Sequence, residues 1–203
     1  DTIISLHVTG KLSGTLDSAR MAAKELVGKF HIYPIDSASG SAAMGYMLRE
    51  ARLMERAGAS LEAIKERLAQ ISRDVQVILT LNNLEYARRS GRVKALQAAL
   101  ASILSVKPVI ILKEGMLELG DRVRTRSKSL DYILDLTANR VGKKAVNVAV
   151  VHSEDPQAGR TLMDRVRERL NCKNLIMTEL SIGVAANLGP GTIGIVAYPF
   201  EGV

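Results

Sequence analysis

The feature that most constrains the fold is a repeated alternation between two hydrophobic patterns in the first 80 residues. Short apolar, β-branched segments of the strand type are each followed by longer segments whose apolar residues recur at helical spacing. In the first such helix, Leu16, Ala19 and Ala23 form one face. Strands that alternate with helices predict an α/β fold with parallel strands, because the helix returns the chain in the same direction.

Residues 1–80 are therefore expected to form a doubly wound, mainly parallel lobe. The expected strands are Thr2–Val8, His31–Asp36 and Val75–Thr80, and the expected helices are 13–27, Ala42–Ala57 and a third that follows a Ser60 cap. Three strands are few for a doubly wound sheet. We therefore expect this lobe to be incomplete at its N-terminus, as if an upstream segment were missing.

The pattern changes after Thr80, where we place a domain boundary, and residues 81–203 are expected to form a second α/β lobe. Glu114-Gly115 between two apolar segments predicts a β-hairpin, and hence a mixed sheet. Residues 182–198 are interpreted as a strand, a turn and a strand. The expected helices are Leu84–Arg89, Lys94–Leu104, Ser127–Val141 and Gln157–Leu170, and the other expected strands are Val106–Lys113, Met116–Arg124, Val146–Val151 and Leu175–Leu180.

Composition excludes several classes of function. The net charge of +7 suits an anionic partner, but aromatic residues are 3% of the chain with no Trp, which disfavours binding to single-stranded nucleic acid. Nucleic acid is therefore not expected as a partner. The lone Cys172 and a start at Asp1 without signal-peptide features lead us to expect a cytoplasmic protein. The three histidines are scattered, and we expect neither a metal site nor a cofactor.

Ser13-Gly14-Thr15 marks the first candidate site, at the turn from the first strand to the first helix. Gly14 permits close approach of a ligand, and the N–H groups at a helix start favour an anion. Helix capping by Ser13 or Thr15 explains the same residues without any ligand. Asp36 and Ser37 follow the second strand in the same way and are expected at the same site; in the alternative, Asp36 or Ser39 only caps the next helix.

Other polar residues are weaker candidates. The segment Asn187 to Gly191 either exposes backbone amides at a cleft or forms only a tight turn. Arg122 and Arg124 lie two apart on an expected strand, so both would point to one positively charged face. Arg88, Arg89, Arg92 and Lys94 form a second basic cluster. No nucleotide-binding, nucleophile or metal motif is present, which favours a binding protein over an enzyme.

Several short motifs occur in a specific order over nearly the whole chain. They are Leu12-Ser13-Gly14-Thr15, Ile35-Asp36-Ser37, Gly45, Gly58, Thr80-Leu81, Leu84-Glu85-Tyr86, Gly91-Arg92-Val93, Lys107-Pro108-Val109, Gly115, Val123-Arg124-Thr125 and Gly189-Pro190-Gly191. In order and spacing they resemble the DegV family. The resemblance implies a two-lobed lipid-binding protein that holds a long-chain, palmitate-like fatty acid, with the tail buried and the carboxylate between the lobes.

The resemblance also implies roles for particular residues and a partner. Ser13, Gly14 and Thr15 would bind the carboxylate, and the protein would present the fatty acid to a fatty acid kinase for phospholipid metabolism. Transient contact with a membrane surface also follows. The expected head-group vicinity comprises Asp36, Ser37, Asn187, Gly189 and Gly191. From charge alone, we expect Arg92, Arg122 and Arg124 to dock the kinase.

The sequence departs from the family pattern in three places. The family has an upstream segment with further strands and a second carboxylate-binding loop, a His where this chain has Asn187, and Gly-Gly-Arg where it has Ser90-Gly91-Arg92. Asn187 can donate a hydrogen bond but cannot carry charge. An enzyme acting on a phosphorylated or carboxylated metabolite is the alternative function. A nucleic-acid-binding regulator is a third, because of the positive charge.

Overall fold

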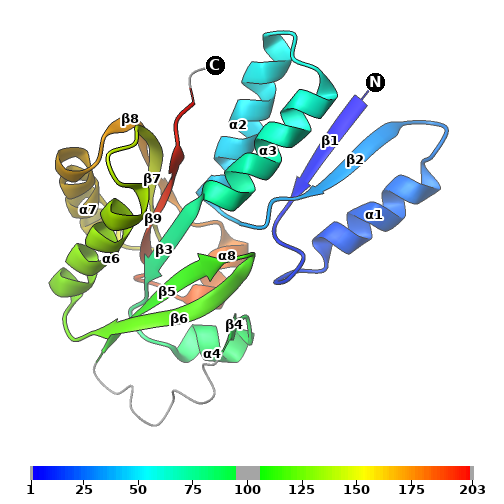
Figure 1. Cartoon of the computed structure of the whole chain (residues 1–203). Coiled ribbons are helices and arrows are strands. Elements are labelled where there is room, and N and C mark those ends of the chain that lie inside the picture. Colours follow the sequence, from blue (N-terminus) through cyan, green and yellow to red (C-terminus); the bar gives the residue numbers. More distant parts are fainter. Residues whose placement is uncertain (1, 95–105, 202–203) are drawn as a thin grey trace. The chain divides into compact units, whose positions relative to one another are not determined.

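The computed structural model describes residues 2–94 and 106–201, and Figure 1 labels its elements. The chain divides into two compact units. The first comprises Asp1–Arg73 and Glu114–Met116, and the second comprises Asp74–Lys113 and Leu117–Gly202. The division precedes strand β3 (Gln76–Thr80) instead of following it near Thr80, because β3 pairs with strands of the second unit.

The first unit contains a small parallel sheet. Strands β1 (Thr2–His7) and β2 (His31–Asp36) pair in register, with Thr2 opposite His31 and His7 opposite Asp36. Helix α1 (Thr15–Glu25) connects them and packs on both strands (Figure 1), with Leu16 buried beneath it. The carboxyl ends of both strands therefore lie at one edge of the sheet, and so do the loops that follow them.

A helical hairpin completes the first unit. Helix α2 (Ala42–Arg56) buries Tyr46 and Met47, and helix α3 (Leu61–Asp74) buries its apolar stripe of Ile64, Leu68 and Ile71. Arg67 and Glu50 form an ion pair of 3.8 Å between the two helices, and both side chains are buried. Ser60 accepts a hydrogen bond from the Ala63 amide, as its expected role as a cap requires.

The second unit is built on a mixed sheet of seven strands in the order β4-β6-β5-β3-β9-β7-β8. Strand β3 is antiparallel to β5 and β9, β9 is antiparallel to β7, and β7 is parallel to β8. These strands are β4 (Val93–Lys94), β5 (Lys107–Lys113), β6 (Met116–Val123), β7 (Val146–His152), β8 (Cys172–Glu179) and β9 (Ile193–Pro199).

Helices α6 (Arg126–Val141) and α7 (Pro156–Arg169) supply the core of the second unit. Ile133 of α6 and Leu162 of α7 pack with the buried valines of β7 and the isoleucines of β9 in one cluster. Thr125 caps α6 by accepting from the Lys128 amide, and Asp155 caps α7 by accepting from the Ala158 amide. The α/β class with a mixed sheet, as expected from the sequence, is confirmed.

Three expectations for the second lobe were wrong in detail. Residues Ile182–Leu188 form a short helix, α8, and not a strand. The prediction failed because a short apolar segment shows no period by which a helix can be told from a strand. Lys94 belongs to β4, and the rest of the helix expected at 94–104 lies outside the described residues. Arg124 follows the end of β6, so it does not share a strand face with Arg122.

Candidate functional site

The loop that follows β1 presents Ser13 and Thr15 at the start of α1. The hydroxyl of Ser13 donates to Thr15 Oγ1 at 3.2 Å, and Ser13 Oγ accepts from the Thr15 amide at 3.3 Å. Thr15 is exposed and Ser13 is half-buried. Gly14 is the N-cap residue of α1 and no side chain caps the helix, so the capping interpretation is wrong, and Ser13 binds only the amide of the first helical residue. Both hydroxyls still lie at the surface, where a ligand can reach them.

The loop that follows β2 is hydrogen-bonded to the loop that follows β1. Asp36 Oδ2 accepts from the Gly10 amide at 3.2 Å, and the Thr9 amide donates to the Ser39 carbonyl at 2.9 Å. Ser37 is fully buried, and its hydroxyl donates to the Ser39 carbonyl. The structure thus brings the two candidate loops together, but it uses Asp36 and Ser37 to hold the loops and leaves Ser13 and Thr15 to face outward.

Backbone strain is concentrated in the second of these loops. Ala38 has φ of 47° and Ser41 has φ of 56°, values that residues other than glycine rarely adopt. Ser41 is the N-cap residue of α2, yet its side chain makes no capping hydrogen bond. Strained non-glycine residues cluster at binding sites, where surrounding contacts hold a required backbone path.

The hairpin tip Glu114-Gly115 belongs to the first unit and contacts the loop after β1. Thr9 Oγ1 donates to the Gly115 carbonyl at 3.0 Å, and Lys11 Nζ donates to the Glu114 carbonyl at 2.7 Å. Both tip residues have positive φ, 48° and 78°, as the tight hairpin turn requires. Sequence reasoning missed Thr9 and Lys11. The available signal was a Thr-Gly pair directly after a strand.

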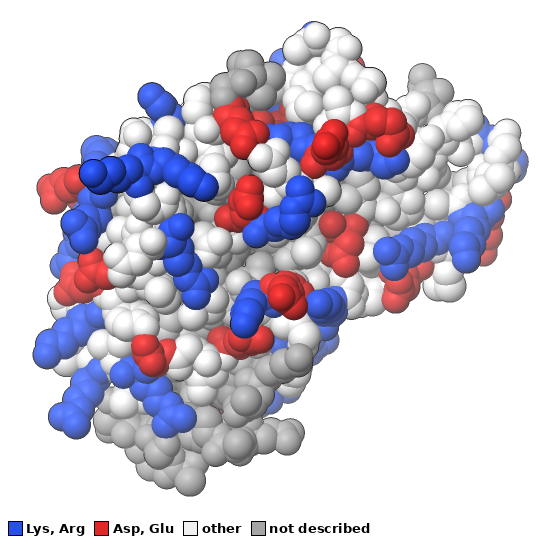
Figure 2. All heavy atoms as spheres, in the orientation of Figure 1, with Lys and Arg blue, Asp and Glu red and all other residues white. Residues whose placement is uncertain are grey.

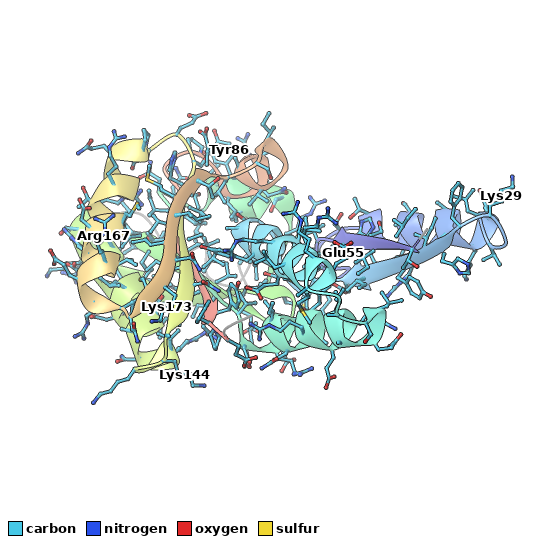
Figure 3. The ribbon with its side chains drawn as sticks, turned by 90° about the horizontal axis from the view of Figure 1, so that it is seen from above. Lys29, Glu55, Tyr86, Lys144, Arg167 and Lys173 are labelled. Carbon is cyan, nitrogen blue, oxygen red and sulfur yellow. The ribbon has the colours of Figure 1, made fainter. Side chains whose placement is uncertain are left out.

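The candidate residues near the C-terminus lie in the second unit, on α8 and the turn after it. The amide of Asn187 donates from Nδ2 to the Gly183 carbonyl at 2.6 Å. Gly189 has φ of 88°, and a Cβ there would lie 2.5 Å from the ring of Tyr86. The side chain of Tyr86 is labelled in Figure 3. The Gly191 carbonyl accepts from Arg126 Nη2 at 2.7 Å. This glycine-rich turn is therefore shaped by close packing within its own unit.

Three of the basic residues make local hydrogen bonds or ion pairs. Arg92 Nη1 donates to the Ser90 carbonyl, Arg89 pairs with Glu85, and Arg126 pairs with Asp155 at 3.0 Å. Figure 2 shows Lys and Arg interleaved with Asp and Glu on the face in view. The face shown in Figure 2 is therefore mixed in charge.

The described residues contain no group of His, Cys, Asp and Glu that could hold a metal ion. In the same part of the chain, no helix is both long and apolar enough to span a membrane.

Cys172 begins β8 instead of lying in a turn, and partial burial raises the pKa of its thiol. The pKa of the Tyr132 hydroxyl is raised mainly by its hydrogen bond to Asp121. Neither group lies in the loops that hold Ser13.

The family model, the related sequences and the solved structures that resemble this chain all point to one family. The model of the DegV family, described as uncharacterised, matches residues 1–199. A DegV domain-containing protein of Streptomyces coelicolor is 32% identical over 97% of this chain and 69% of its own length. The DegV family protein of Thermus thermophilus, described by its fatty acid binding, superimposes with a TM-score of 0.91 at 35% identity, over 98% of this chain and 71% of that one.

A second solved structure points the same way. The stearic acid-binding protein of Eubacterium ventriosum has a TM-score of 0.89 and 26% identity, over 98% of this chain and 70% of that one. The chain thus spans about 70% of the length of these relatives. The match over residues 1–199 and the identity to the relatives place this chain in the DegV family.

Proposed function

We propose that this protein binds a long-chain fatty acid and presents it to a separate fatty acid kinase. The fatty-acid-binding relative from Thermus thermophilus supports the ligand class. The observation on this chain that carries the proposal is the pair of accessible hydroxyls, Ser13 and Thr15, at the start of α1. A helix start with accessible hydroxyls and N–H groups suits a carboxylate.

In this proposal the head group replaces a local hydrogen bond. The Ser13 hydroxyl turns from Thr15 Oγ1 to a carboxylate oxygen, and the Thr15 hydroxyl becomes a second donor. The N–H groups of the first helical turn add a favourable dipole. Asp17 in the same turn carries a negative charge that opposes the ligand, but it is paired with Arg20 at 3.1 Å.

The acyl chain supplies most of the affinity. Burial of about 14 methylene groups at about 0.8 kcal/mol each contributes on the order of 11 kcal/mol before the costs of binding. Hydrogen bonds to the charged carboxylate add about 1.5–3 kcal/mol each. Ser13 therefore acts mainly on where the head group lies and less on whether the lipid binds.

Contact with the kinase is assigned to the exposed basic residues Arg92, Arg122 and Arg124, which suit an acidic protein surface. A transient contact with a membrane, from which the lipid is taken, is supported by Ile182, whose side chain is 88% exposed on α8. The proposal includes a cytoplasmic location, because phosphorylation of the lipid by the kinase requires ATP.

The first test measures lipid binding directly. Native mass spectrometry of the purified protein, followed by lipid extraction, is expected to show one fatty acid per chain, and added palmitate is expected to fill lipid-free protein. A protein that neither co-purifies with lipid nor takes up palmitate contradicts the proposal. The protein alone is expected to convert nothing, because in this proposal the separate kinase supplies the catalytic groups.

Ser13→Ala tests the role of the head-group site. We expect palmitate still to bind, with affinity lowered about tenfold or less, since one hydrogen bond is lost while the tail remains buried. Acyl phosphate formation by a bacterial fatty acid kinase is expected to fall more steeply. Ser60→Ala is the matched control, because Ser60 also accepts a backbone amide at a helix start in the first unit. Equal phosphorylation with Ser13→Ala and wild-type protein refutes the assignment.

A further inference from the structure

We infer that Thr9 is the positioning residue for Ser13, an inference that rests on the proposed role of Ser13 in binding a carboxylate. Thr9 is only 1% exposed although it is polar and lies in a loop. Its carbonyl accepts from the Leu12 amide at 3.1 Å and from the Ser13 amide at 3.2 Å. The path of the backbone into Ser13 is therefore set by hydrogen bonds to this one residue.

Three further hydrogen bonds hold Thr9 itself. Its amide donates to the Ser39 carbonyl at 2.9 Å, its hydroxyl donates to the Gly115 carbonyl at 3.0 Å, and Oγ1 accepts from the Lys11 amide at 3.3 Å. The contacts reach the loop after β2, the hairpin tip and its own loop. Because Thr9 is buried, it cannot touch the carboxylate, and its effect passes through the turn to Ser13.

The hairpin tip fits Thr9 closely. Gly115 has φ of 78°, and a Cβ at this position would lie 2.5 Å from Thr9 Oγ1 and 3.6 Å from the Ala38 Cα. A side chain at Gly115 would therefore displace the Thr9 hydroxyl. Lys11 Nζ donates to the neighbouring Glu114 carbonyl at 2.7 Å, so two consecutive tip carbonyls are bound by this loop.

The Thr9 hydroxyl is the part of this arrangement that a substitution can remove without changing side-chain shape. Thr9→Val keeps the volume but leaves the Gly115 carbonyl and the Lys11 amide without their partner. Thr9→Ser keeps the hydroxyl and is the rescue variant. Thr137→Val is the matched control, because Thr137 is also fully buried and donates to one backbone carbonyl, that of Ile133.

Two measurements test the inference. The first is the carboxyl resonance of bound [1-¹³C]palmitate, with stoichiometry determined in the same sample. Thr9→Val is expected to bind one palmitate but to shift the carboxyl resonance toward its position in Ser13→Ala, whereas Thr9→Ser and Thr137→Val keep the wild-type position. A general loss of stability would not shift the carboxyl resonance while one palmitate stays bound. A wild-type resonance in Thr9→Val, when Ser13→Ala shifts it, overturns the inference.

The second measurement does not require a ligand. Amide hydrogen exchange over residues 9–16 is expected to be about fivefold faster or more in Thr9→Val, and unchanged in Thr137→Val. Exchange that is unchanged in Thr9→Val overturns the inference. If wild-type protein binds no palmitate, the proposed function fails, and hydrogen exchange still decides whether Thr9 holds the turn at Ser13.

Discussion

Arg126→Met tests whether one arginine holds together the start of α6, the cap of α7 and the glycine-rich turn. Arg126 Nη2 donates to Asp155 Oδ2 at 3.0 Å and to the Gly191 carbonyl at 2.7 Å. Methionine keeps most of the apolar stem but removes both donors. The substitution therefore isolates the hydrogen bonds of the guanidinium group from its packing.

The expected loss in the free energy of unfolding follows from the number of hydrogen bonds that are removed and from their exposure to water. A hydrogen bond to a charged group contributes about 1.5–3 kcal/mol. The side chains of Arg126 and Asp155 are 26% and 33% exposed, so water competes for both groups. Taking the lower end for the pair and about 0.5 kcal/mol for the carbonyl, we expect the free energy of unfolding to fall by about 2 kcal/mol.

Urea denaturation of Arg126→Met and of the control Arg165→Met measures this difference. Arg165 makes a single ion pair with Asp131 at 2.6 Å, and these side chains are 34% and 55% exposed. The control is expected to cost about 0.5 kcal/mol, and less at 1 M salt, where surface charges are screened. Equal losses of stability in the two variants would refute the reasoning, because they would show that contact with the Gly191 turn contributes nothing.

Two further predictions concern packing and the thiol. Gly189→Ala is expected to lower the free energy of unfolding by at least about 2 kcal/mol in urea denaturation, because φ of 88° and the Tyr86 ring both oppose a Cβ. Gly183→Ala within the preceding helix α8, where a Cβ meets nothing within 4 Å, is expected to be neutral or stabilising; equal losses would contradict this. Since burial raises the pKa of the Cys172 thiol, less thiolate is present at pH 8, and alkylation by iodoacetamide is expected to be slower than in the unfolded chain; equal rates would contradict this.

Local pattern was sufficient for most elements of this fold. The strand expected at His31–Asp36 has those bounds in the structure, and the helix expected at Ala42–Ala57 ends one residue earlier, at Arg56. In both segments the apolar residues recur with a clear period, and glycine or serine residues lie at the ends. The segment Ile182–Leu188 also lies between a serine and a glycine, but it is too short to show a period. It is helical in the structure, where Thr192 Oγ1 donates to the carbonyls of Leu188 and Gly189 at its end.

The candidate site remains a prediction from the sequence. The sequence pointed to Ser13 and Thr15, because a hydroxyl pair around a glycine between a strand and a helix is a local signal. It placed Asp36 and Ser37 in the vicinity of the head group, and in the structure their polar atoms bind backbone groups of the loops. Which polar side chains face outward depends on contacts between segments, and a pattern along one segment does not contain them.

The sequence by itself determined the α/β class, most of the order of elements and the family, since these depend on periodicity and on motifs that are continuous along the chain. Only the tertiary structure decided that β3 joins the seven-stranded sheet, and that Gly115, far from Thr9 along the chain, accepts its hydroxyl. Strand pairing and the burial of Thr9 arise from groups distant in sequence, and their free energy is realised only when the chain has folded.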